Sequence, residues 1–111
     1  MTERFLDYPE VLNNLKKVAN NGQIEFTDSA KYHTLLPFLP DDEIERQIKL
    51  NRETNQKIIG DSYQPVGFFP PEMAYSPKLV PILEKLGYKW IIIDEIAKTG
   101  KLDQSVTYKI K

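Results

Sequence analysis

The chain has 111 residues, and its 15 basic side chains nearly cancel its 16 acidic ones, for a formal net charge of −1. This length suffices for one modest core, so we expect a single domain over residues 1–111. The balanced charge excludes the basic stripe of a nucleic-acid-binding protein. Because the sequence contains no cysteine, disulfides and thiolate sites are excluded as well.

The N-terminus has neither a basic n-region nor an apolar h-region, so it does not form a signal peptide. The longest strongly apolar run, Trp90 to Ile93, is far shorter than a membrane span. We therefore expect a soluble, cytoplasmic protein without a membrane partner.

The first predicted helix covers Tyr8 to Asn20. Pro9 occupies a favourable first helical position, and Asn20-Asn21-Gly22 provides a stop. Apolar residues recur at helical spacing within it: Val11, Leu12, Leu15, Val18 and Ala19. The β-prone run Gln23 to Thr27 predicts the first strand.

A second helix is predicted from Asp41 to Ile58, because acidic residues at its start suit the helix dipole and Gly60 follows its end. Its buried side is marked by Ile44, Ile48 and Ile59. Residues Val66 to Phe69 predict the second strand. Together these segments repeat the order of helix, glycine and strand.

The third helix is predicted to start at Ser76-Pro77, with Pro81 still in its first turn, and to end at Gly87. Tyr88 to Asp94 is a β-branched run typical of a parallel strand covered on both faces. Val106 to Ile110 alternates apolar with polar residues and predicts a half-exposed strand.

Three successive helix–strand units predict an α/β fold with parallel strands, either an open sheet or part of a (β/α) barrel. Right-handed crossovers place the three strand exits on one edge, where parallel α/β enzymes build their sites. Polar residues follow each predicted strand there: Asp28, Ser29, Lys31, Tyr32 and His33; Glu72; Asp94 and Glu95.

Glu72 has the most specific surroundings of these residues. Pro70-Pro71 stiffens the backbone before it, and apolar or aromatic side chains surround it, namely Phe68, Phe69, Met73 and Tyr75. Such a wall can stack on a sugar ring and desolvate a carboxyl group. From the residues alone, a catalytic carboxylate and a turn residue answering a helix dipole are about equally supported.

The other candidates are more ambiguous. A lone histidine such as His33 is more often hydrogen-bonded inside a packed loop than in contact with a sugar hydroxyl. No His-x-His or His-x-x-x-His spacing exists, so no metal site is predicted. Asp94 could contact substrate or cap the following turn, and a structural role is favoured for Glu95. Glu25 lies on a strand, where a charge usually faces solvent, but it could point toward the site if the strand lines a barrel.

Four segments in register resemble glycoside hydrolase family 57. They are Gly22 to Phe26, Tyr32 to Leu39, Gly67 to Tyr75 and Leu86 to Glu95. The resemblance implies the middle part of a catalytic (β/α)7 barrel, with about three βα units, acting on α-glucans as in amylases, branching enzymes and 4-α-glucanotransferases. It implies a retaining mechanism with Glu72 as nucleophile and no metal or organic cofactor. The expected substrate-binding residues are His33, Tyr32, Phe69, Met73, Tyr75 and Asp94.

The family's first motif and its downstream acid/base aspartate have no counterpart in this sequence. A complete barrel needs roughly 200–250 residues, about twice this length. We expect either a piece of a longer enzyme, a remnant gene product, or a non-catalytic carbohydrate-binding or interaction module descended from such an enzyme. Expected partners are an α-glucan or oligosaccharide and, through open sheet edges, the remainder of the enzyme or a second copy.

Overall fold

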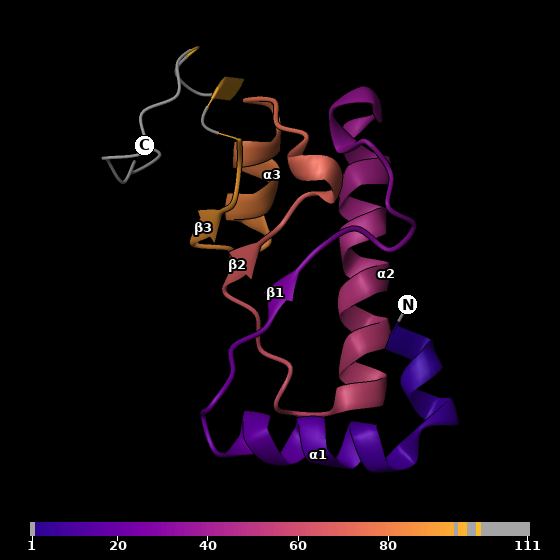
Figure 1. Cartoon of the computed structure of the whole chain (residues 1–111). Coiled ribbons are helices and arrows are strands. Elements are labelled where there is room, and N and C mark those ends of the chain that lie inside the picture. The colour runs from indigo at the N-terminus through magenta and orange to yellow at the C-terminus, as the bar shows by residue number, and fades with distance from the viewer. Residues whose placement is uncertain (1, 95, 98–99, 101–111) are drawn as a thin grey trace.

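The computed structural model describes residues 2–94, 96–97 and 100 of the chain. Three α-helices and three short strands alternate along it: α1 (Pro9–Asn20), β1 (Thr27–Asp28), α2 (Asp41–Ile59), β2 (Gly67–Phe68), α3 (Leu79–Lys85) and β3 (Trp90–Ile91) (Figure 1). Short 3₁₀ turns η1 (Thr2–Asp7), η2 (Leu36–Phe38) and η3 (Pro71–Met73) precede α1 and follow β1 and β2. This order confirms the predicted α/β class.

The strands form one parallel sheet in the order β1-β2-β3. Thr27 pairs with Gly67 and Asp28 with Phe68, and β3 continues the same register. Parallel hydrogen bonds extend past the strand ends, since the amide of Phe69 donates to the carbonyl of Asp28 at 2.8 Å. All three strand exits therefore lie at one edge, as the helix–strand rhythm predicts.

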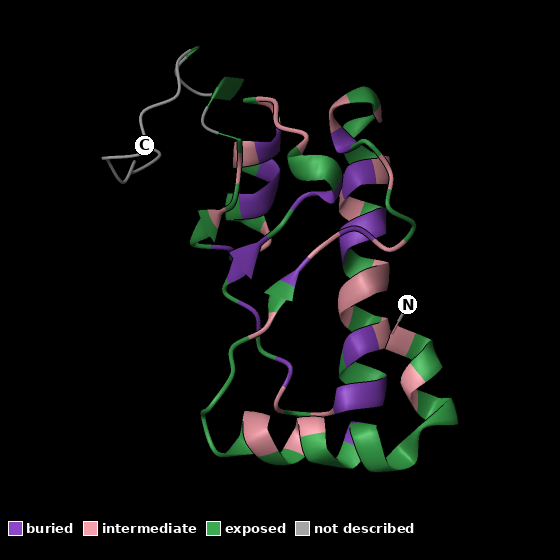
Figure 2. Cartoon of the chain, viewed as in Figure 1, coloured by how far each residue is buried: buried purple, intermediate pink, exposed green. Residues whose placement is uncertain are grey.

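The hydrophobic core lies where α2 and α3 meet each other and one face of the sheet. Because side chains alternate along a strand, Asp28 and Phe68 share this face and are fully buried. Figure 2 shows buried positions on α2 and α3, whereas α1 is mostly exposed. The core cluster comprises Ala30, Leu36, Ile44, Ile48, Phe68, Leu79, Ile82, Leu83 and Tyr88.

The opposite face of the sheet is open in the part of the chain that the structure describes. Trp90 is 41% exposed, and its indole lies over Gly67, where an added Cβ atom would come within 2.0 Å of the ring. Ile92 is equally exposed. The expectation that residues 88–94 form a strand covered on both faces is therefore wrong, because helices cover only one face and no layer of the described chain covers the other.

Local end signals predicted the helices better than the strands. α1 has Pro9 at its first position, and α2 ends at Gly60, whose φ of 90° favours glycine. The predicted cap at Ser76 is wrong: α3 begins at Leu79, and the carbonyl of Ser76 instead accepts the Leu79 amide at 3.0 Å. Pro81 is third in α3, within the first turn, where its missing N–H leaves no helical bond unmade.

The strands are shorter than predicted. Residues 23–26 are not paired in the sheet, and Ile24 is 38% exposed there, so the β-prone run before Thr27 overestimated the first strand. Glu25 is exposed, as expected for a charge at that position. The predicted strand from Val106 to Ile110 lies outside the described residues. Within the described ranges, no helix has the length and apolar character needed to cross a membrane.

Candidate active site

The structure brings together two of the candidate residues from the sequence, Glu72 and His33. The Nε2 atom of His33 lies 2.8 Å from Oε1 of Glu72, although the two are 39 residues apart. His33 belongs to the loop after β1 and Glu72 to η3 after β2, so adjacent strand exits supply them. Their side chains are 71% and 67% exposed, which leaves the pair accessible from solvent. The view of His33 as a histidine inside a packed loop is therefore wrong.

The backbone at this site is strained. His33 has a φ of 54°, Glu72 of 57° and Met73 of 52°, and these are the non-glycine residues with positive φ in the described part of the chain. Side chains in the left-handed region cost on the order of 1–2 kcal/mol per residue, and such strain concentrates at functional sites. The fold thus holds both members of the pair in conformations that neither would adopt freely.

The two prolines before Glu72 hold its turn in place. Pro70 and Pro71 are buried, which fixes the start of η3 against the core. The Met73 amide donates to the carbonyl of Pro70 at 3.0 Å and the Ala74 amide to that of Pro71 at 3.1 Å. Glu72 therefore projects from a tight turn with a fixed base, and the exposed carboxylate is the part of the turn that remains available for chemistry.

Met73 offers a test of the strain that does not alter the His33–Glu72 pair. We expect Met73→Gly to raise the free energy of unfolding by about 0.5–1 kcal/mol, because glycine adopts a φ of 52° without a Cβ clash and this gain exceeds its extra chain entropy. Urea unfolding measures the change. Met73→Ala, which keeps the clash, is the matched control, and equal stability of the two variants would contradict the prediction.

The other predicted substrate-binding residues are distributed unevenly around the pair. Tyr32 precedes His33 and is 65% exposed, Phe69 and Met73 flank the Glu72 turn at 41% and 39%, and Tyr75 is half-buried. All four residues are close to His33 or Glu72 in the sequence. Asp94 does not join it: its Oδ1 accepts the Ile96 amide at 2.8 Å, which is the turn-capping alternative.

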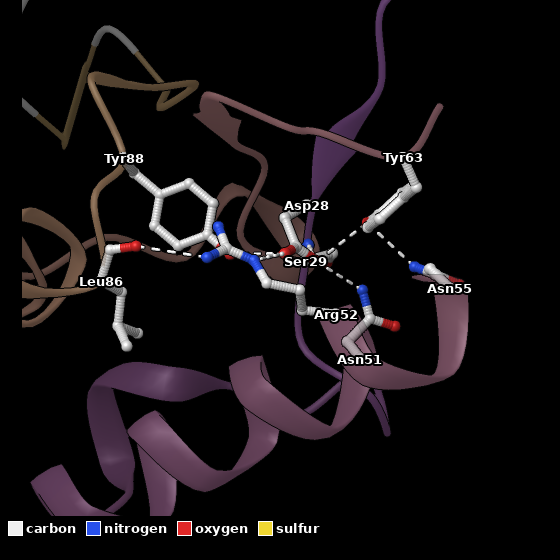
Figure 3. A network of polar contacts seen from close by, with 8 residues as sticks. All are labelled: Asp28, Ser29, Asn51, Arg52, Asn55, Tyr63, Leu86 and Tyr88. Atoms are coloured by element: carbon white, nitrogen blue, oxygen red, sulfur yellow. Dashed lines mark hydrogen bonds and ion pairs between the residues drawn. The ribbon is translucent and has the colours of Figure 1, made fainter. Parts of the chain in front are cut away.

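A buried polar network surrounds Asp28, the last residue of β1 (Figure 3). The carboxylate of Asp28, with no exposed surface, accepts five hydrogen bonds. Its Oδ1 accepts from the Ser29 amide at 2.9 Å, Asn51 Nδ2 at 2.7 Å and the Tyr63 hydroxyl at 3.0 Å. Its Oδ2 accepts from Arg52 Nε at 3.2 Å and the Tyr88 hydroxyl at 2.5 Å.

The network ties three separate segments to the sheet: α2, the loop that carries Tyr63, and residues 86–88. Arg52 also donates to the carbonyl of Leu86 at 3.3 Å and stacks over the Tyr88 ring, 4.5 Å from its centroid. Asn55 donates to the Tyr63 hydroxyl at 2.9 Å. Asp28 follows the first strand in the sequence, but a saturated carboxylate without exposed surface cannot contact substrate, so its part is to fix the strand exit that leads to His33.

The tyrosines of this network should make the protein less stable at alkaline pH. Burial, with the neighbouring Asp28 carboxylate, raises the pKa of Tyr63 and of Tyr88 far above the usual value. The contribution of these tyrosines to the free energy of unfolding is therefore fully present below about pH 10, the pKa of tyrosine in the unfolded chain. Above that pH it falls by up to about 1.4 kcal/mol per pH unit for each tyrosine. Urea unfolding at pH 9 and pH 11 measures the loss, which should be smaller in Tyr63→Phe. Equal stability at both pH values would contradict the prediction.

At the edge where the strands end, the groups available for chemistry are one carboxylate, Glu72, and one imidazole, His33. No cluster of three or more His, Cys, Asp or Glu side chains suited to a metal ion occurs among the residues described. An exposed carboxylate can attack an electrophilic carbon, and a neutral or protonated imidazole beside it can donate a hydrogen bond or hold a proton. Apolar and aromatic neighbours add a surface on which a sugar ring can stack.

Comparison with known proteins places this chain in a family. The family model of glycosyl hydrolase family 57 matches residues 3–111. The α-amylase 1 of Dictyoglomus thermophilum is 31% identical over 90 residues, which cover 80% of this chain and 13% of that protein. The α-amylase of Pyrococcus horikoshii is 29% identical over 87 residues, covering 78% and 13%. A crystal structure of the 4-α-glucanotransferase from Thermococcus litoralis matches with a TM-score of 0.74 and 23% identity, over 84% of this chain and 14% of that one.

The fold is thus a parallel α/β unit that forms part of a barrel, as in that solved structure. The chain belongs to glycosyl hydrolase family 57. It spans about 13% of the length of these two α-amylases.

Two buried polar residues, Asp28 and Gln47, have weak signals in the sequence. Gln47 is 3% exposed and lies between Ile44 and Ile48 on the apolar side of α2, where a polar residue is out of place. Asp28 carries the same kind of signal, as an acid next to the buried core. A polar side chain within an apolar stripe is the pattern that could have found both.

Proposed function

We propose that this chain provides the nucleophile of a retaining glycosyl transfer on α-glucans, with Glu72 as that nucleophile. The relatives are named α-amylase and 4-α-glucanotransferase, both of which act on α-linked glucose polymers. Their names support the substrate class, and the segment around Glu72 supports the assignment of the residue. His33 serves as a hydrogen-bond partner for a sugar hydroxyl at the reacting centre.

One observation carries the proposal: the exposed His33–Glu72 pair on strained backbone at the rim of parallel strands. A structural ion pair at a surface contributes little stability, about 0–1 kcal/mol, and would not justify two left-handed residues. A nucleophile must instead be held still and exposed toward its substrate. The geometry of Glu72 meets both requirements.

In this mechanism Glu72 attacks the anomeric carbon, the bond to the leaving oxygen breaks, and a glycosyl ester forms on the Glu72 carboxyl. A second carboxyl, about 5–5.5 Å away in retaining enzymes, protonates the leaving oxygen and then deprotonates water or an acceptor sugar. We propose that this group comes from another segment of the barrel. Tyr32, Phe69, Met73 and Tyr75 supply the apolar surface against which the sugar stacks.

α-Maltosyl fluoride tests the nucleophile without requiring that second carboxyl. Fluoride leaves as an anion without protonation, so only attack by Glu72 is needed to form the ester. We expect intact-mass spectrometry to show one added maltosyl group and peptide mapping to place it on Glu72. Maltoheptaose binding without labelling would favour a non-catalytic binding module, and the absence of both would overturn the proposal.

We further propose that the open edges of β1 and β3 receive additional parallel strands of the same barrel. Each has a single neighbouring strand in the described structure, and unpaired edges invite pairing. Outward-facing amides of Thr27 and Ile91 should then exchange rapidly with solvent in this chain alone. Strong protection of those amides at high dilution would contradict this arrangement.

A further inference from the structure

The loop that carries His33 is attached to the middle of α2 by two hydrogen bonds to Gln47. The backbone carbonyl of Gln47 accepts the amide of Lys31 at 3.2 Å. Its side-chain Oε1 accepts the amide of Tyr32, also at 3.2 Å. Gln47 therefore receives the two consecutive N–H groups that come immediately before His33.

Gln47 is itself held rigidly. It is 3% exposed, and its Nε2 donates to Oε1 of Glu43 one helical turn earlier, at 2.8 Å. With Nε2 engaged by a carboxylate, Oε1 is directed toward the loop, which sets the orientation of the amide. Ile44 and Ile48, on the same side of α2, are buried in the core. The acceptor for the loop is thus part of the rigid core.

A second attachment reinforces the same loop. The Nζ atom of Lys31 donates to Oγ1 of Thr54 at 3.0 Å and forms an ion pair with Glu3. Ala30 is buried in the core on the other side of Lys31. After Tyr32 the chain leaves α2, and His33 enters the left-handed region and points to Glu72. The last fixed point before this turn is the bond to Gln47.

We propose that Gln47 is a positioning residue that aims His33 at Glu72. The inference rests on the proposed function of that pair, but it concerns a contact that exists without substrate. Without the acceptor on Gln47, the Tyr32 amide has no partner, and the strained conformation of His33 loses its nearest restraint. The imidazole then samples other directions, and its contact with Glu72 is lost for much of the time.

The chain contains one histidine, so its imidazole ¹⁵N resonances report on this contact without ambiguity. In Glu72→Ala the Nε2 resonance should move, which defines the shift of an imidazole that has lost its contact with the carboxylate. Gln47→Met, of similar volume but without the acceptor, should move the resonance at least halfway toward that position. Adding Gln47→Met to Glu72→Ala should cause little further change. Gln56→Met, at an exposed position on the same helix, should leave the resonance unchanged.

A Gln47→Met variant that folds and keeps the wild-type resonance would overturn the proposal. If this variant does not fold, amide exchange on the wild-type chain decides. The Tyr32 amide should exchange at least about tenfold more slowly than in an unstructured peptide, and exchange at the free rate would overturn the proposal. Because these measurements use no glucan, they hold or fail separately from the maltosyl labelling that tests the function.

Discussion

Replacement of Glu72 by glutamine is expected to abolish the formation of a maltosyl ester from α-maltosyl fluoride, lowering its rate at least ~10³-fold. Glutamine has nearly the same shape and can still meet His33 at the position that Oε1 of Glu72 now occupies. Its amide is a far weaker nucleophile than a carboxylate, so the chemistry is removed while the turn is kept. Time-resolved intact-mass spectrometry of the two proteins measures the ratio of the rates.

Two further variants distinguish this effect from a general loss of structure. Glu53→Gln removes an exposed carboxyl on α2 and should leave labelling unchanged. His33→Ala keeps the nucleophile but loses one sugar contact, so it should weaken maltoheptaose binding roughly fivefold to tenfold. Labelling that persists in Glu72→Gln at the wild-type rate would exclude Glu72 as the nucleophile.

The helices were predictable because their signals are local. The proline at the start of α1 and the glycine after α2 act within one turn of the helix end, and both predictions are confirmed. Strand length depends instead on the neighbours available for pairing. Residues 23–26 are β-prone but remain outside the sheet. Trp90 is exposed, although it lies in a β-branched run that predicts a buried strand. No local pattern contains that information.

The candidate site was predictable to the same limited degree. Glu72 stands out because two prolines and an aromatic wall surround it in sequence. The exposure of His33 and its contact with Glu72 depend on how two strand exits meet, which a lone histidine does not reveal. The turn-capping role of Asp94 was one of two open alternatives. Asp28 and Gln47 bond partners more than 10 residues away, so the sequence shows only a polar side chain within an apolar stripe, and the partners emerge in the fold.

Asp28→Asn should cause the largest loss of stability of the variants proposed for this chain. We expect the free energy of unfolding to fall by about 3 kcal/mol, because a buried carboxylate that accepts five hydrogen bonds is replaced by an amide. In either orientation the new NH₂ group meets donors. Toward Arg52 it meets a guanidinium that cannot accept, and toward Ser29 it meets a backbone amide with the same limitation.

Urea unfolding followed by the fluorescence of the single tryptophan, Trp90, measures this loss. Asp61→Asn changes an exposed aspartate and should alter stability by less than about 0.5 kcal/mol. A loss below about 1 kcal/mol in Asp28→Asn would show that the network does not hold the strand exit. If the loss is as large as expected, folded molecules of the variant should also show a displaced His33 resonance. The loop to His33 begins directly after Asp28, so the stability of the core and the geometry of the site depend on the same carboxylate.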